Sequence, residues 1–229
     1  MRKNFFYKNI KKNNHKILFF LIFLQFKYSL KMKKIGVTGG IGSGKSVVCK
    51  IFNNLKVPVY NSDEVAKKIL NYDKEIISAL KNNFGDDIYL NSNILDKKKL
   101  SKIIFNDKLS LKKVNEIVHP VVKKHFQNWL EKRKKEKNKY IIKEAAILFE
   151  SGTFRELDKI ITVFSPENIR IKRLEIRDKV DVNTIRKKIS NQISEEEKIK
   201  MSDFVIYNDD KNLLVPQVLK IHKFLKRKI

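Results

Sequence analysis

The chain has 229 residues and 42% of them are hydrophobic, which is enough for one domain with a packed core and excludes a disordered tail. Its single cysteine, Cys49, excludes an intrachain disulfide and suits a reducing cytoplasm, and the four scattered histidines show no zinc-ligand spacing. The net charge of +26 would suit a nucleic-acid-binding protein, but the lysines are spread along the whole chain and accompany many Asn, Ile, Phe and Tyr, the residues of A/T-rich codons. We therefore interpret the charge as a solvated basic surface, expect no specific nucleic acid as a partner, and keep nucleic-acid binding as a remote alternative.

Residues 1–31 differ from the rest of the chain. They are rich in Lys and Arg, lack Asp and Glu, and contain an apolar run at residues 17–26. That run is much shorter than the roughly 20 residues that span a bilayer, and no small-residue cleavage site of a signal peptide follows it. Because Met32 stands directly before the first predicted strand, we interpret 1–31 as a mis-assigned start or a dispensable extension, and we expect no stable membrane insertion.

From Met32 onward, strand and helix patterns alternate. Short apolar runs predict strands at 34–38, 57–60, 139–142, 159–164 and 204–207. Helical spacing predicts helices at 45–55, from Ser62 or Asp63 to about 70, at 166–177, 183–192 and 213–225, and through most of the charged stretch 73–137. This order indicates an α/β fold with a parallel sheet, carrying a helical insertion.

A glycine-rich turn follows the first predicted strand. Five of the seven glycines fall within residues 36–44, and residues 39–46 match the phosphate-binding loop pattern G-x-x-x-x-G-K-[ST] between a strand and a helix. Glycines let the backbone approach phosphate oxygens, and loop N–H groups with the helix N-terminus face an anion. We therefore expect the loop to bind the phosphates of a nucleotide, with Lys45 at the β/γ-phosphates and the Ser46 hydroxyl as a Mg²⁺ ligand. The expected nucleotide contacts are Gly39, Gly40, Ile41, Gly42, Ser43, Gly44, Lys45, Ser46 and Val47.

The loop alone does not separate kinases from GTPases or motor ATPases. A GTPase needs a D-x-x-G switch, but Gly85 and Gly152, the glycines beyond the loop, follow Asn82 and Phe149 at the third position before them. The base-reading N-K-x-D motif is absent as well, and no apolar strand followed by Asp is obvious. These features favour a small-molecule kinase.

Several polar residues are candidates for the rest of the site. Asp63 follows the second strand, at the sheet edge where ligands bind, so it is either the base that orients an acceptor hydroxyl or a helix cap. Arg173 and Arg177 could close over the ATP phosphates as a lid, with Asp178 orienting Arg177, whereas we interpret Arg170 as part of a solvated basic face.

Three further residues carry weaker signals. His119 is either structural or part of a substrate pocket, Glu150 is expected to face the ligand edge of the sheet, and Cys49 is interpreted as a small core residue.

The chain resembles the dephospho-coenzyme A kinase family from residue 33 to residue 208. The motifs are I-G-V-T-G-G-I-G-S-G-K-S at 35–46, S-D-x-x-A at 62–66, V-H-P at 118–120, L-F-E at 148–150, R-x-x-x-R-D at 173–178 with Gln192, and D-F-V-I-x-N at 203–208. The paired glycines Gly39 and Gly40 are among its more specific features. Three positions depart from the family pattern: Asn61 replaces the first Asp of an acidic pair, Val47 replaces Thr, and Ala146 replaces a proline before the L-F-E element.

The resemblance implies a P-loop NTPase fold: a three-layer α/β/α core with a mainly parallel five-stranded sheet, a helical CoA-binding insertion at about 64–138 and a lid at about 173–200. It implies transfer of the ATP γ-phosphate to the ribose 3′-hydroxyl of dephospho-CoA, the last step of coenzyme A biosynthesis, in the cytoplasm. Asp63, Lys45 and Arg177 would be catalytic, Arg173 and Asn208 would bind the nucleotide, and Asp63, His119 and Glu150 would bind the acceptor. Another small-molecule or nucleoside monophosphate kinase is the alternative, and the oligomeric state is open.

Overall fold

The computed structural model describes residues 32–90, 94–136 and 138–227. The predicted extension at 1–31 lies outside these residues. Within them, no helix is both long and apolar enough to cross a membrane.

Five strands form one sheet in the order β2-β3-β1-β4-β5, and every neighbouring pair is parallel. The strands are β1 (Lys33–Thr38), β2 (Val59–Asn61), β3 (Tyr140–Glu144), β4 (Lys159–Phe164) and β5 (Phe204–Tyr207). Helices cover both faces of such a sheet, so its central strands read as apolar runs without alternation. The predicted mainly parallel five-stranded sheet is confirmed; β4 and β5 have the predicted ends, and the ends of the other three strands differ from the prediction by at most two residues.

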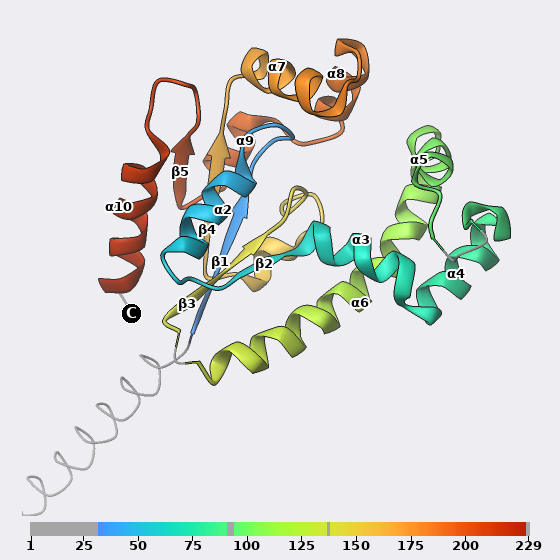
Figure 1. The fold of residues 1–229 in the computed structure, drawn as a ribbon, viewed down its shortest axis with the longest axis horizontal. Helices are drawn as coiled ribbons and strands as arrows, with labels where there is room; N and C mark the ends of the chain where they lie inside the picture. The colour runs from blue at the N-terminus through green and yellow to red at the C-terminus, as the bar shows by residue number, and fades with distance from the viewer. Residues whose placement is uncertain (1–31, 91–93, 137, 228–229) are drawn as a thin grey trace, which may run out of the picture.

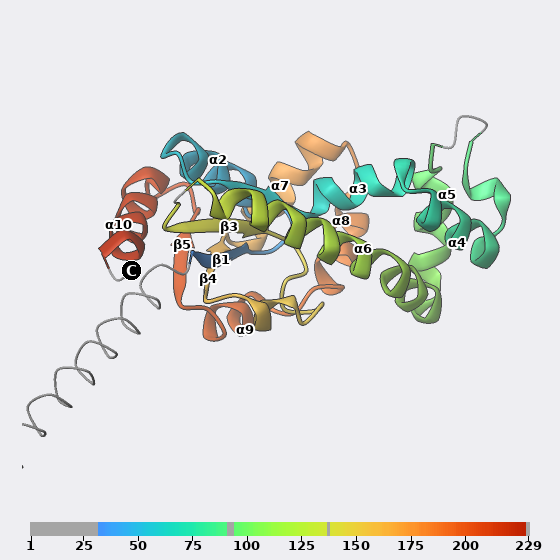
Figure 2. The same cartoon turned by 90° about the horizontal axis from the view of Figure 1, so that it is seen from below.

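Three layers are visible in Figures 1 and 2, with α2 on one face of the sheet and α9 on the other. Helices α2 (Lys45–Asn54) and α10 (Leu214–Arg227) share a buried cluster with alternate residues of the strands, among them Ile142 and Ile161. Cys49 belongs to this cluster, as predicted. The opposite face carries α6 (Lys108–Lys134), whose Phe126 packs on Ile141, and α9 (Glu195–Lys200), a short helix that the sequence did not predict.

The predicted helical insertion forms an arm that extends from one end of the sheet (Figure 1). It contains α3 (Ser62–Tyr72), α4 (Lys74–Phe84), the single turn η1 (Asp86–Ile88), α5 (Lys97–Asn106) and the first half of α6, and it has its own hydrophobic cluster. The cap of α3 corrects one expectation: Asn61 is the N-cap, with its side-chain oxygen accepting from the Glu64 N–H at 2.9 Å, so neither Ser62 nor Asp63 caps this helix. Asp63 therefore remains available for a ligand.

The segment after β4 contains α7 (Glu167–Asp178) and α8 (Val182–Ser190), which lie beyond the carboxyl end of β4 in Figure 1. The short turn η2 (Thr153–Glu156) lies between β3 and β4 in the chain. The carboxyl ends of the parallel strands form one edge of the sheet, and the glycine-rich loop, α3, the segment after β3, and the segment that leads to α7 all begin at this edge.

Candidate functional site

The turn between β1 and α2 is built to receive an anion. Gly44 is the N-cap of α2 with φ 91°, and no side chain caps this helix. A left-handed residue at this point suits glycine, because a Cβ is disfavoured there. The first N–H groups of a helix have no intrahelical acceptor, so those at Lys45 and Ser46 can donate to phosphate oxygens.

Gly40 has a different role, which is close packing. A Cβ at this position would lie 2.1 Å from Arg170 Nη1 and 2.6 Å from Glu195 Oε1. The absence of a side chain at Gly40 therefore lets two charged side chains lie directly against the loop.

This packing corrects the interpretation of Arg170 as part of a solvated face. Arg170 is 4% exposed and lies 3.7 Å from Glu195, which also pairs with the fully buried Lys198 at 2.8 Å. Helical spacing on α7 could not reveal this burial, because the partner helix α9 was not predicted.

Lys45 extends from the loop into the site. Its Nζ donates to the carbonyl oxygens of Gly39 and Gly40 at 2.9 and 3.3 Å. Burial lowers the pKa of the Lys45 ammonium, and the nearby carboxylates of Asp63 and Glu144 oppose that effect. A cation at this place lies between the loop and the two carboxylates.

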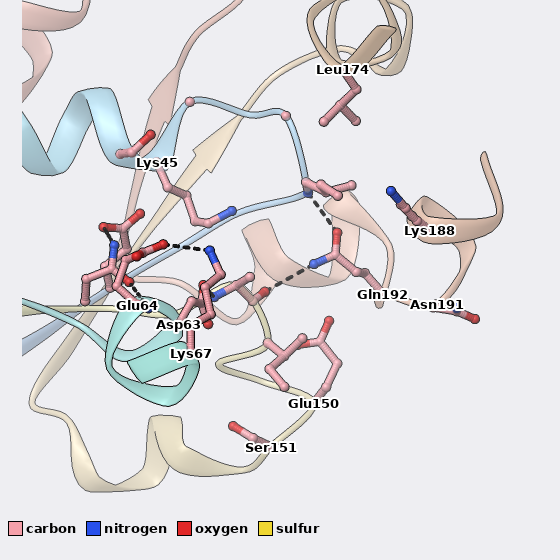
Figure 3. Close-up of a pocket in the computed structure, with 18 of the residues that line it drawn as sticks. Lys45, Asp63, Glu64, Lys67, Glu150, Ser151, Leu174, Lys188, Asn191 and Gln192 are labelled. Atoms are coloured by element: carbon pink, nitrogen blue, oxygen red, sulfur yellow. Dashed lines mark hydrogen bonds and ion pairs between the residues drawn. The ribbon is translucent and has the colours of Figure 1, made fainter. Parts of the chain in front are cut away.

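The main cavity has a volume of about 1010 Å³ and opens between the loop, α3 and the helices after β4. Figure 3 shows Asp63 and Glu64 on one side of it and Gln192, Lys188 and Asn191 on the other. The other predicted residues that line it are Ile41, Gly42, Gly44, Lys45, Ser46, His119, Glu150, Arg173 and Arg177. The remaining predicted loop residues, Gly39, Gly40, Ser43 and Val47, do not line it, and Ser43 is fully buried.

A second cavity of about 570 Å³ lies between α3, α6 and the segment after β3. The two cavities share Asp63, Asn115, His119, Ile147 and Ser151. Among the described residues, Asp63 is the one carboxylate that lines both. The two cavities therefore meet at this side chain.

Asp63 is held by the backbone of the segment after β3. The Ala146 N–H donates to its Oδ2 at 3.2 Å, which leaves Oδ1 for another partner. Burial raises the pKa of the Asp63 carboxyl, while Lys45 and this hydrogen bond lower it. A raised pKa makes a carboxylate a better proton acceptor near neutral pH.

Glu144, at the end of β3, is a site residue that the sequence interpretation missed. Its Oε2 accepts from Asn61 Nδ2 at 3.0 Å, and the Cys49 thiol lies against it. Burial raises the pKa of Glu144, the Lys45 charge lowers it, and Asp63 raises it further. The sequence did contain a signal for this residue. The run Y-I-I-K-E is a mostly apolar strand that ends in a carboxylate, but the carboxylate is Glu and the expected pattern was an apolar strand followed by Asp.

Asn61, the departure from the acidic pair, is explained by this contact. The register of β2 on β3 pairs Asn61 with Glu144, and a carboxylate in place of the amide would face a second carboxylate at hydrogen-bond distance. The amide donates to Glu144 and caps α3 with its oxygen.

The two arginines that were predicted to form part of a lid have different partners. Arg173 Nη2 lies 2.6 Å from Asp210 Oδ1 and its guanidinium contacts Asn208, whereas Arg177 Nε donates to Asp178 at 2.7 Å, as predicted for that pair. Asn208 in turn donates from Nδ2 to the Ser43 carbonyl at 2.7 Å. Asn208 therefore lies against the base of the loop and not in the main cavity.

Two contacts tie the loop and the segment after β3 to the residues that follow α8. Gln192 Oε1 accepts from the Ile41 N–H at 2.8 Å, and Glu150 Oε1 accepts from the Ile193 N–H at 3.1 Å. Glu150 faces the ligand edge, as expected.

His119, from α6, lines both cavities, and burial lowers the pKa of its imidazole, with Lys143 adding to the effect. A neutral imidazole can both donate and accept a hydrogen bond.

The oxygen atoms at the site suit a hard cation whose remaining coordination positions are filled by a bound ligand. Across 32–90, 94–136 and 138–227, no group of three or more His, Cys, Asp or Glu could hold a metal by itself. Ser46 at the start of α2, with Glu144 and Asp63, offers a hydroxyl and two carboxylates. Proteins commonly hold Mg²⁺ with one or two carboxylates together with waters and substrate phosphates, and these residues fit such an ion.

Comparison with known proteins gives consistent results. The family model described as dephospho-CoA kinase matches residues 33–213. A dephospho-CoA kinase of Bacteroides fragilis is 41% identical over 196 residues, which is 86% of this chain and 94% of that protein. The corresponding enzyme of Porphyromonas gingivalis is 39% identical over 198 residues, 86% of this chain and 96% of that protein.

Solved structures agree with the sequence comparison. A crystal structure from Thermus thermophilus has a TM-score of 0.74 at 27% identity, covering 84% of this chain and 97% of that chain. A dephospho-CoA kinase from Campylobacter jejuni has a TM-score of 0.64 at 27% identity, covering 87% of this chain and all of that chain.

Proposed function

The chain belongs to the dephospho-CoA kinase family, and from that premise we propose that ATP and dephospho-CoA meet at Asp63. As a member it is a P-loop kinase of coenzyme A biosynthesis, an ATP-using enzyme with a small-molecule substrate. In the proposed reaction the ATP γ-phosphate passes to the ribose 3′-hydroxyl of dephospho-CoA. The observation that carries the proposal is that Asp63 lines both cavities.

The nucleotide is proposed to occupy the main cavity. Its phosphates would accept from the loop N–H groups and the uncapped start of α2, and Lys45 would exchange its contacts with loop carbonyls for the β/γ-phosphates. Arg173 and Arg177 line the same cavity and would neutralise charge that develops on the transferring group. Asn208 would act indirectly, by holding Ser43 and Arg173.

The acceptor is proposed to occupy the smaller cavity, with its hydroxyl at Asp63. The free Oδ1 would take the hydroxyl proton as the oxygen attacks phosphorus, while the Ala146 N–H keeps the carboxylate oriented. His119 lines the wall of the same cavity and Glu150 the adjoining one, so both are proposed as acceptor contacts.

A Mg²⁺ ion is proposed at Ser46, with Glu144 holding it directly or through water. Such an ion neutralises charge on the β- and γ-phosphates. The raised pKa of Glu144 supports this assignment, because a carboxylate whose ionised form is disfavoured by burial gains from a nearby cation.

The compartment and surface are also part of the proposal. The single, buried Cys49 suits the reducing cytoplasm, where we place the enzyme. The lysines of the described residues are spread over core, arm and lid and do not form one stripe, which supports a solvated surface over a nucleic-acid footprint.

An ADP-release assay tests the proposed function. The full chain with Mg-ATP is expected to turn over dephospho-CoA in preference to nucleoside monophosphates and other hydroxyl acceptors in the same panel. Preference for another acceptor would support the alternative of a different small-molecule kinase. Absence of any turnover that depends on dephospho-CoA would overturn the assignment.

A further inference from the structure

Lys143 of β3 is a charged residue that has no role in the proposed mechanism. Side chains alternate along a strand, so Glu144 faces α2 and Lys143 faces α6 with Ile141. Lys143 is only 5% exposed. A lysine this deeply buried is rare unless it has a partner.

The ammonium of Lys143 lies over the ring of Phe126, with 4.6 Å from Nζ to the ring centre. Within the described part of the chain, no carboxylate lies within 4.0 Å of it, and Nζ makes no hydrogen bond. Lys123, on the rim of the same cavity, differs in this respect because Glu156 pairs with it at 2.5 Å. A cation–π contact compensates only part of the cost of removing an ammonium from water.

The surroundings of Lys143 leave it short of negative charge. Lys34 and Lys123 add positive charge nearby, and Glu156, the carboxylate whose charge acts on Lys143, pairs with Lys123. An anion that entered the cavity would therefore meet a buried ammonium that has no carboxylate partner among the described residues.

Lys143 lines the smaller cavity, in which the acceptor is proposed to lie, and Asp63 lines that cavity as well. In an acceptor of the proposed kind, the 3′-hydroxyl and the 5′-diphosphate are attached to one ribose. If the hydroxyl lies at Asp63, the diphosphate of the same molecule therefore lies in this cavity. The rest of the cavity wall includes the apolar side chains of Leu70, Val118 and Val122.

We infer that Lys143 is the buried cation that binds the acceptor's diphosphate, and so selects a 5′-diphosphorylated ribose over an unphosphorylated one. This inference rests on the proposed function, since it assumes that the acceptor enters the smaller cavity. It assigns to Lys143 a role in acceptor binding and none in the binding of ATP.

Steady-state kinetics of Lys143→Met test the inference, because Met keeps the length of the chain and removes the charge. At saturating Mg-ATP, the KM for dephospho-CoA is expected to rise at least about tenfold, while the KM for ATP is unchanged. The Ki of adenosine, as a competitor of dephospho-CoA that lacks phosphate, is expected to stay within about twofold because it has no group for Lys143 to bind. Lys143→Arg should recover most of the affinity for dephospho-CoA.

Lys220→Met, on the exposed side of α10, is the matched control and should change none of these constants. An unchanged KM for dephospho-CoA in Lys143→Met would overturn the inference. So would an equal loss of adenosine affinity, because that would make the residue a contact of the nucleoside or a structural element. Lys143→Gln gives the same comparison if the Met variant fails to fold. Failure of the proposed function is read separately, as absence of dephospho-CoA turnover by the unsubstituted chain.

Discussion

Replacing Asp63 with Asn tests the centre of the proposed site. The Asn oxygen can still accept from the Ala146 N–H, which Asp63 now does at 3.2 Å, so the change removes the proton acceptor and little else. A positioned general base contributes about 10²–10⁴ in rate, and burial raises the pKa of Asp63 toward the working pH, where a base is most effective. We therefore expect kcat to fall about 10³-fold, which is about 4 kcal/mol of transition-state stabilisation.

The same variant should bind ATP normally and remain folded. Removing a carboxylate that burial disfavours should leave Tm within about 4 °C, the shift that about 1 kcal/mol causes in a chain of this size. ADP release gives kcat, titration with a non-hydrolysable ATP analogue gives Kd, and Asp86→Asn on the exposed arm is the control. If Asp63→Asn kept kcat within about fivefold, Asp63 would not be the base; if it lost ATP binding, its role would be structural.

Three further predictions concern charges near the loop. Because Asp63 accepts a proton only when ionised, kcat/KM should fall as pH decreases through its raised pKa; a profile flat down to about 3.9, the ordinary value, would contradict this. Glu144→Gln should raise the Mg²⁺ concentration for half-maximal velocity about 10–100-fold, and an unchanged Mg²⁺ titration would remove Glu144 from the metal site. Glu195→Gln leaves Arg170 and Lys198 buried without their anion. It should therefore destabilise the fold by about 3–5 kcal/mol and lower Tm by about 6–20 °C. A decrease in Tm of less than about 3 °C in a thermal melt would show that these two ion pairs are dispensable for stability.

Much of the fold follows from patterns that act over a few residues. The apolar run before the glycines, the loop motif and the helical spacing after it predict β1, the phosphate-binding turn and α2 without reference to the rest of the chain. The parallel sheet follows from the alternation of strands and helices. Sequence patterns predicted the ends of the elements less well and missed α9. This helix has a capping box at Ser194, but its six residues are too few to show a clear helical period of apolar residues.

The site itself was only partly predictable from these local patterns. The motifs predict Lys45, Ser46 and Asp63 as site residues, but position alone left Asp63 either a base or a cap. The structure decides the cap in favour of Asn61, because its side chain accepts from the helix N–H while its amide reaches Glu144. Glu144 lies 83 positions away in the sequence and meets Asn61 only because β2 pairs with β3 in that register.

The sequence by itself therefore determined the glycine-rich loop. Its glycines and the start of the following helix suit phosphates, and Lys45 and Ser46 add an ammonium and a hydroxyl. Only the tertiary structure decided which charges are buried around that loop. Arg170 looks like an exposed residue of a basic helix until α9 brings Glu195 against it, and Lys143 looks like one lysine among many until α6 covers it. Burial changes the energy of a charge far more than sequence neighbours do, and burial is set by segments that are distant in the chain.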